Sequence, residues 1–155
     1  MRKLLILLCA FIIIILFVVF QNQENETPTL ELSRISTSDI NNDVVLSIKE
    51  NSITSETQEL NLVYENKSKE EYIYGGVDFL EMKADGKWYS LAPKENVQWN
   101  MLAYTLPPES IKESIFSIKA YYGDLTKGKY RIVKTLSQSD NKNKETYVIA
   151  EFIIK

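Results

Sequence analysis

The decapeptide Leu125-Thr126-Lys127-Gly128-Lys129-Tyr130-Arg131-Ile132-Val133-Lys134 decides how this chain folds. A glycine two residues before a tyrosine, at the head of a β-branched run, predicts a tight turn that leads into a strand, with Gly128 free to take a positive φ. In Greek-key β-sandwiches a tyrosine in this position turns its hydroxyl back onto the backbone a few residues upstream and fixes the crossover between the two sheets. Gly128 and Tyr130 are therefore predicted to be structural. The alternative is an ordinary half-buried strand tyrosine after an ordinary turn.

The nearest candidate for a positively charged surface lies in the same stretch and consists of Lys127, Lys129, Arg131 and Lys134. The chain has a formal net charge of −3, with 18 basic and 21 acidic residues. Two of the basic residues precede the N-terminal apolar run, so the remainder of the chain carries about −5. Binding to polyphosphate needs a clustered positive surface. A nucleic-acid partner is therefore not expected, and these four side chains are predicted to form the solvated side of one strand and its turn.

Short strand patterns lie on both sides of the decapeptide. Segments with the alternating or β-branched composition of strands are 30–32, 44–48, 60–64, 72–74, 79–83 and 88–91. Asp85-Gly86, between the last two of these, is the strongest hairpin signal in the chain. Residues 147–154 predict a final strand that turns Glu151 outward and places four residues on its inner face: Val148, Ala150, Phe152 and Ile154. Seven to nine short strands with little helix predict an all-β sandwich.

Two segments are less regular. Residues 94–104 predict an irregular crossover, closed by Pro107-Pro108. Residues 110–118 fit a helix, because Ser110 and Glu113 match a capping box, but they also alternate as a strand does, and we prefer the strand. Residues 137–144 are expected to form a polar loop.

The N-terminus carries a membrane signal. Residues 1–3 form a basic start, and residues 4–20 are an apolar run without a charge, proline or glycine. At 1.5 Å per residue this run of roughly 17 residues spans about 25 Å, the short end of what crosses a bilayer. A cleaved signal peptide and a lipoprotein acylated at Cys9 are alternatives, but the small residues expected at their cleavage sites are missing. We expect an uncleaved single-pass anchor with the N-terminus in the cytoplasm, a polar stalk over 21–33 and an extracellular domain over 34–155.

The residue inventory excludes several kinds of site. Cys9 is the single cysteine and lies in the apolar run, so the domain has no internal disulfide. The chain contains no histidine, which removes Ser-His-Asp and Cys-His catalysis and zinc sites that use histidine or several cysteines. We predict no cofactor and no metal.

Six segments together resemble a known family: Tyr74-Gly75, Phe79 to Lys83, Asp85 to Tyr89, Tyr122 to Leu125, Gly128 to Lys134 and Ala150 to Phe152. They are similar to the bacterial immunoglobulin-like domains found on membrane-anchored and secreted proteins of Gram-positive bacteria. The resemblance covers roughly Asp43 to Ile154 and implies an immunoglobulin-like Greek-key sandwich outside the membrane. It brings no catalytic residues and no settled ligand. An extra edge strand within 30–42 is a separate expectation.

Three functions follow as hypotheses. The first is a membrane-anchored, non-catalytic interaction module that binds a protein or an envelope polymer. One version uses an aromatic platform for wall glycan, for whose members core packing is the alternative role: Trp88, Tyr89, Trp99, Tyr121 and Tyr122. The second is a passive subunit or sensor of a membrane complex. The third is a carboxylate-based wall-glycan enzyme that uses Glu70, Glu71 and Asp78, although adjacent glutamates more often form a solvated turn.

Overall fold

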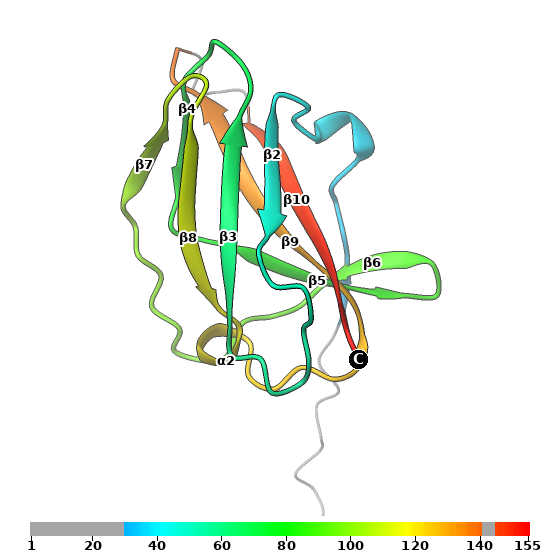
Figure 1. Cartoon of the computed structure of the whole chain (residues 1–155). Coiled ribbons are helices and arrows are strands. Elements are labelled where there is room, and N and C mark those ends of the chain that lie inside the picture. Colours follow the sequence, from blue (N-terminus) through cyan, green and yellow to red (C-terminus); the bar gives the residue numbers. More distant parts are fainter. Residues whose placement is uncertain (1–29, 141–144) are drawn as a thin grey trace, which may run out of the picture.

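Ten strands in two sheets make up most of the regular structure of residues 30–140 and 145–155, which are the residues that the computed structural model describes (Figure 1). The strands are β1 (Glu31–Leu32), β2 (Val44–Ile48), β3 (Glu59–Asn66), β4 (Tyr72–Gly75), β5 (Phe79–Ala84), β6 (Lys87–Ser90), β7 (Ala103–Leu106), β8 (Ile111–Ser117), β9 (Gly128–Gln138) and β10 (Glu145–Ile154). A 3₁₀ turn, η1 (Thr37–Asp39), and a single helical turn, α2 (Ile118–Tyr121), complete them.

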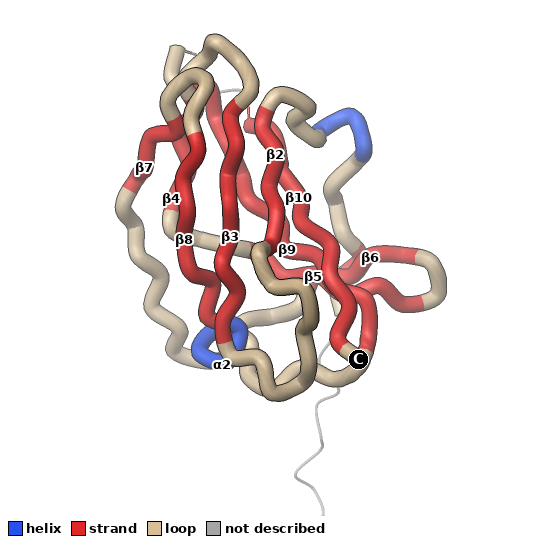
Figure 2. Tube along the Cα trace, in the orientation of Figure 1, coloured by secondary structure: helices blue, strands red, loops and turns tan. Residues whose placement is uncertain are grey.

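The larger sheet has seven strands in the order β1-β6-β5-β9-β4-β7, with β10 also paired to β9. The smaller sheet has three, in the order β2-β3-β8. In Figure 2 the smaller sheet lies in front of the larger one, and the β5–β6 hairpin projects on the side opposite β7. The all-β sandwich is thus confirmed. It has ten strands rather than the seven to nine predicted, and β7 lies partly inside the segment predicted to be an irregular crossover.

Strand β9 organises the larger sheet. It pairs with β10 along one edge through ten residue pairs. Its other edge pairs with β5 from Tyr130 to Val133 and with β4 from Leu136 to Gln138. The chain between β4 and β5 leaves the ladder at Gly76, where a Cβ would collide with the carbonyl oxygen of Asn100. A glycine there lets the segment that leads to β7 approach the break closely.

The core lies between the sheets. The even-numbered residues of β9 and β10 face inward, and Tyr130, Ile132, Leu136, Val148, Ala150, Phe152 and Ile154 are all buried there. They pack with Leu60, Leu62 and Tyr64 of the smaller sheet. The predicted inner face of the last strand is therefore confirmed. Every second side chain of these strands is buried in the core. This apolar burial is the main stabilisation of the sandwich, because the described residues contain no cysteine to form a disulfide.

Local patterns explain two further elements. Residues 111–117 form a strand, β8, and the helical turn α2 begins only at Ile118, so the strand preferred for this segment is confirmed. Asp85 and Gly86 both have positive φ, 48° and 78°, at the tip of the β5–β6 hairpin. Positive φ at both central residues is the geometry that two-residue hairpins favour, and it explains the Asp-Gly pair.

The beginning of the domain carries the extra edge strand expected within 30–42. Glu31 and Leu32 pair with β6, and the backbone N–H of Ser33 donates to the carbonyl of Trp88 at 2.9 Å. The sheet therefore begins inside the range 21–33 that was predicted as stalk, because these backbone groups find partners on β6. No helix within 30–140 or 145–155 has the length and hydropathy to cross a bilayer. The predicted anchor, 4–20, lies outside the described residues.

Candidate functional site

Two edge strands meet on one side of the sandwich, which we call the open side. β7 is the edge of the larger sheet beyond β4, and β8 is the edge of the smaller sheet beyond β3 (Figure 1). Within the described chain, neither strand has a partner on its outer edge. On the opposite side β2 lies against β10, so the two sheets close over the core there.

A pocket of about 250 Å³ opens between these two edges. The larger sheet contributes Tyr74 and Gly75 of β4, Tyr104 of β7 and Lys134 of β9, and the smaller sheet contributes Glu113, Ser114 and Ile115 of β8. Asp78 lines the pocket from the break between β4 and β5. The pocket therefore reaches between the sheets to two charged groups that lie inside the fold.

Asp78 and Lys134 form a buried ion pair beside the pocket. The Lys134 ammonium is 2.9 Å from Oδ1 of Asp78 and donates to the carbonyl of Val77 at 3.1 Å. Oδ1 accepts no well-aligned hydrogen bond from any described residue. Burial raises the pKa of the Asp78 carboxyl, and the Lys134 charge opposes that rise. Hydrogen bonding from Lys134 and Tyr64 also opposes the rise, so the pair is neutral as a whole and its carboxylate has two polar neighbours.

Three tyrosines stack beside this ion pair. Tyr64 lies against Tyr74 at 5.0 Å between ring centroids, and Tyr74 lies against Tyr104 at 5.5 Å. The Lys134 ammonium sits 5.5 Å from the Tyr74 ring centroid. Burial, with the Asp78 carboxylate nearby, raises the pKa of Tyr64, and burial also raises that of Tyr74. The Tyr74 hydroxyl, which lines the pocket, therefore stays protonated and offers a hydrogen-bonding group without adding charge.

The rim of the open side is apolar and exposed. Met101 is 85% exposed, Leu102 61% and Ile115 62%, and Ile111 and Tyr104 are also exposed. The chain has no charged residue between Glu95 and Glu109, which includes the whole of β7. An uncharged, apolar edge strand is a template for pairing with another chain, and folded proteins usually protect such edges with charges or a covering segment.

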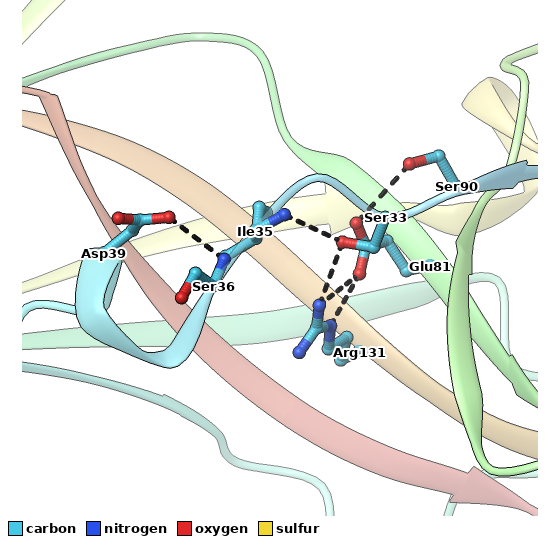
Figure 3. A network of polar contacts seen from close by, with 7 residues as sticks. All are labelled: Ser33, Ile35, Ser36, Asp39, Glu81, Ser90 and Arg131. Atoms are coloured by element: carbon cyan, nitrogen blue, oxygen red, sulfur yellow. Dashed lines mark hydrogen bonds and ion pairs between the residues drawn. The ribbon is translucent and has the colours of Figure 1, made fainter.

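A second buried ion pair lies on the outer face of the larger sheet (Figure 3). Nε and Nη2 of Arg131 each lie 2.6 Å from Oε2 of Glu81, the residue directly opposite on β5. Nη2 also donates to the hydroxyl of Ser33 at 3.2 Å, and Ser90 donates to the other carboxylate oxygen at 3.4 Å. The Trp88 ring covers the guanidinium at 4.5 Å. This cluster attaches the segment before β2 to the sheet.

The two buried pairs correct the interpretation of the basic residues. Lys127 and Lys129 lie near the solvent, and Lys129 pairs with Glu151 at 2.5 Å. Arg131 and Lys134 are buried, with 7% and 3% of their surface exposed. The prediction that all four form a solvated side was therefore wrong for these two. Strand β9 is covered on both faces, and each buried cation has a carboxylate partner from the β4–β5 region.

Tyr130 and Gly128 lie at the start of β9. The buried Tyr130 hydroxyl donates to the carbonyl of Thr126 at 2.8 Å, and its ring stacks on Phe152. Gly128 does not have a positive φ, so the expected left-handed turn is wrong. A Cβ at Gly128 would instead lie 3.3 Å from Cε2 of Tyr130. The glycine leaves room for the tyrosine ring, and the structural role of both residues stays a prediction.

The five aromatic residues proposed as a platform do not form one. All are half-buried, and each lies against its own neighbours. Trp88 covers Arg131, and Trp99 lies against Tyr121 at 4.5 Å. The Tyr122 hydroxyl accepts from the N–H of Leu80 and donates to the carbonyl of Asp78, and burial raises the pKa of Tyr122 to about 12. Of the five, only Tyr121 lines the pocket, where the other aromatic residues are Tyr74 and Tyr104.

The carboxylates proposed for catalysis are not arranged as a pair. Glu70 and Glu71 lie in the turn between β3 and β4, with Glu70 exposed, whereas Asp78 is buried against Lys134. No group of three or more acidic, cysteine or histidine side chains that would suit a metal ion occurs in the described parts of the chain. Asp78 is the member of this set that lies at the open side, where its partner is a cation rather than a second carboxylate.

A comparison with family profiles agrees with this sandwich. A family profile described as "Bacterial Ig-like domain" matches residues 40–152. The chain belongs to the bacterial Ig-like domain family. Among solved structures, this Ig-like domain is similar to the archaellum periplasmic stator protein FlaG from Sulfolobus acidocaldarius, with 11% identity and a TM-score of 0.38, over 72% of this chain and 99% of that one. A search of curated proteins found no match.

Proposed function

We propose that this Ig-like domain is a non-catalytic interaction module, anchored in the membrane of a Gram-positive bacterium by residues 4–20 and displayed outside the cell, and that it binds a protein through the open side. The observation that supports this most strongly is the uncharged edge strand β7, whose neighbours Met101 and Leu102 are 85% and 61% exposed. Such exposure is costly in water unless a partner covers it.

The other edges of the sandwich support the choice of side. β8 carries Lys112 and Glu113, and Glu113 pairs with Lys49 at 2.6 Å. β2 lies against β10. β1 is only two residues long. Charges, cover and shortness are the usual means by which edge strands avoid association. β7 has no charged residue and no described segment covers its outer edge, so it is the edge best suited to a partner.

The membrane proposal rests on the basic start and the apolar run that follows it. Protease added to intact protoplasts should release the Ig-like domain and leave residues 4–20 in the membrane, because the basic residues favour a cytoplasmic N-terminus. Protection of the whole chain would contradict the outward orientation. Release of the domain without any protease would instead indicate that the signal is cleaved.

The binding proposal is tested by site-specific photo-crosslinking of the full chain in its own membrane. A crosslinker at Met101 should give one defined adduct, because this position lies on the open side. The same crosslinker at Lys87, an exposed position in the β5–β6 hairpin on the opposite side, is the matched control and should give none. Equal labelling at both positions, or labelling at neither, would contradict the proposal.

The alternative of a passive subunit predicts a different pattern. If residues 4–20 pack against the helices of a membrane complex, a crosslinker at Ile12 should form the adduct and one at Met101 should not. The run contains no charged residue and no pair of glycines four residues apart, two features that often mark specific helix pairing in membranes.

A further inference from the structure

We propose that the side chains of Lys134 and Asp78 condense within the folded domain to form an amide bond, a covalent link between β9 and the break between β4 and β5. Both side chains are buried and in contact, with the Lys134 nitrogen 2.9 Å from Oδ1 of Asp78. The ion pair seen in the structure is the reactant of this step. The link is independent of the proposed partner, because it forms within one chain.

The reacting atoms are Nζ of Lys134 and Cγ of Asp78. Because Oδ1 is bonded to Cγ, these two atoms are separated by at most one C–O bond length more than the 2.9 Å between Nζ and Oδ1. The ammonium also donates to the carbonyl of Val77 at 3.1 Å and lies 5.5 Å from the Tyr74 ring centroid, which holds it beside the carboxyl. Well-oriented reactants reach effective concentrations of about 10⁵–10⁸ M, far above those of two free side chains in water.

Burial distinguishes this pair from the other ion pairs of the described residues. Four of those pairs lie at the surface, where between 41% and 56% of each lysine side chain is exposed, and hydration favours the separate ions over an amide. The other buried pair, Glu81–Arg131, contains a guanidinium, which stays protonated and is not a nucleophile. Within the described chain, a buried amine meets a buried carboxyl only at Lys134 and Asp78.

The loss of hydration favours condensation. A carboxylate and an ammonium taken out of water lose hydration free energy, which their mutual attraction restores only in part. An amide carries no net charge and loses less on burial. Burial raises the pKa of the Asp78 carboxyl, against the lowering effect of Lys134 and Tyr64, and this favours transfer of a proton from the ammonium to the carboxylate. The transfer leaves an amine facing a carboxylic acid, the two groups from which an amide forms.

The step balances without an added reagent. Nζ forms a bond to Cγ, the bond from Cγ to one carboxyl oxygen breaks, and that oxygen leaves as water with two of the three ammonium protons. The Tyr64 hydroxyl is a hydrogen-bonding neighbour of the Asp78 carboxyl and can pass a proton to the leaving oxygen, because burial raises its pKa and keeps it protonated. The water leaves through the pocket of about 250 Å³ that Asp78 and Lys134 line.

The bond would close a loop from residue 78 to residue 134 in a domain whose described residues contain no cysteine. It would join β9 to the segment between β4 and β5, the two strands that share one of its edges. Such a link restricts the unfolded chain as a disulfide does, but a reductant does not open it.

Intact mass spectrometry of the full chain, recovered from detergent micelles, tests the step. We expect a mass lower by one water molecule than that of the sequence. Cyanogen bromide then locates the bond, because Met82 and Met101 lie between the two residues. Cleavage should release 83–101 and leave 2–82 joined to 102–155 under denaturing conditions. A chain with the full mass of its sequence that gives three separate fragments would overturn the proposal.

Two variants localise the link. Lys134→Arg keeps the cation but cannot form the amide, so it should have its full mass and give three fragments. Lys127→Arg makes the same change at an exposed position on the preceding turn and should lose one water as the parent does. Asp85-Gly86 can also lose one water by closing a succinimide, which leaves the fragments separate. A loss of water that persists in Lys134→Arg would therefore overturn the link.

Tyr64→Phe tests the proton donor. It keeps the ring against Tyr74 and removes the hydroxyl, so after synthesis in vitro the joined fragments should accumulate about tenfold more slowly, or slower still. An equal rate would overturn the role of Tyr64, while joined fragments in the parent would still establish the bond. Chains with the full mass retain the ion pair, and stability measurements on that pair apply to these chains.

Discussion

Strand β9 carries two buried cations three residues apart, and their surroundings differ. Arg131 faces the outer side of the larger sheet, where Glu81, Ser33, Ser90 and Trp88 enclose it. Lys134 faces the inner side, where its partner Asp78 also has the Tyr64 hydroxyl as a neighbour and a pocket lies alongside. The Glu81–Arg131 pair joins β5 to β9 and, through Ser33, holds the segment before β2 against the larger sheet. The second pair lines the pocket on the open side.

The difference shows that burial alone does not identify a functional charge. Both pairs are equally hidden, with Glu81 2% and Asp78 6% exposed. What separates them is their surroundings, because Asp78 and Lys134 line a pocket whereas Ser33, Ser90 and Trp88 enclose the Glu81–Arg131 pair. The following substitutions test whether the two pairs differ in energy as they do in contacts.

The largest effect is expected for Arg131→Met. It leaves the Glu81 carboxylate buried without its partner, which should cost about 3–5 kcal/mol of unfolding free energy. Urea denaturation of the variant beside Lys127→Met, an exposed position on the preceding turn, measures the loss. A change as small as that of Lys127→Met would show that the Glu81–Arg131 pair does not stabilise the fold.

Lys134→Met should cost about 3 kcal/mol at pH 8 and less at pH 4.5. Burial already raises the pKa of Asp78 above its ordinary value of 3.8, and removal of the Lys134 charge raises it further. A folded-state pKa above the unfolded one means that the native state binds more protons, so stability falls as pH rises through that interval. Urea midpoints at the two pH values measure this slope.

The double variant Asp78→Asn/Lys134→Met is the control for this slope, since it removes the titrating carboxyl and should lose the additional pH dependence. A loss in Lys134→Met that is equal at pH 4.5 and pH 8 would mean that Asp78 does not take up a proton when its partner is removed.

Tyr130→Phe should cost about 1–3 kcal/mol, because it keeps the ring on Phe152 and leaves the Thr126 carbonyl without its donor. Tyr89→Phe is the matched control, since the Tyr89 hydroxyl makes no hydrogen bond to any described residue. If Tyr130→Phe and Tyr89→Phe unfold at the same urea concentration as the parent, the corner bond contributes nothing.

The smallest effect is expected for Gly128→Ala, roughly 1 kcal/mol, because the added Cβ presses on the Tyr130 ring at 3.3 Å and the ring must move. Gly75→Ala serves as the comparison, since a Cβ there meets nothing within 4 Å and its φ is not positive. Thermal melts of the two variants separate crowding from the general effect of losing a glycine.

Local sequence patterns were sufficient for most of the sandwich. Alternation located β2, β3 and β10, and the Asp-Gly pair located the β5–β6 hairpin, because these signals depend on neighbouring residues. They failed for β7, whose four residues are short and whose pairing is set by β4, about 30 residues earlier. The sequence patterns also gave the wrong reason for the glycine at position 128. Its φ is not positive, and what excludes a larger residue is the Tyr130 ring two residues later.

Local sequence patterns could not predict the candidate site, because its residues come from distant parts of the chain. Arg131 and Lys134 appear solvated in a sequence of alternating residues, and only partners 50 and 56 positions earlier make their burial possible. Asp78 was singled out for its carboxylate but assigned to a catalytic pair, since nothing nearby in the chain indicates a lysine partner. The uncharged segment from Asn96 to Pro108 was visible in the sequence. Its meaning depends on the tertiary fold, which leaves this segment at an edge.

The position of β9 in the chain also constrains when the domain can fold. β4 and β5 lie on the same edge of β9, and β10 covers the other, so the larger sheet lacks its central member until residues 128–138 are available. They follow the end of β5 in the chain by more than 40 residues. The order of the strands along the sequence therefore makes assembly of the larger sheet depend on contacts between distant segments, which slows folding.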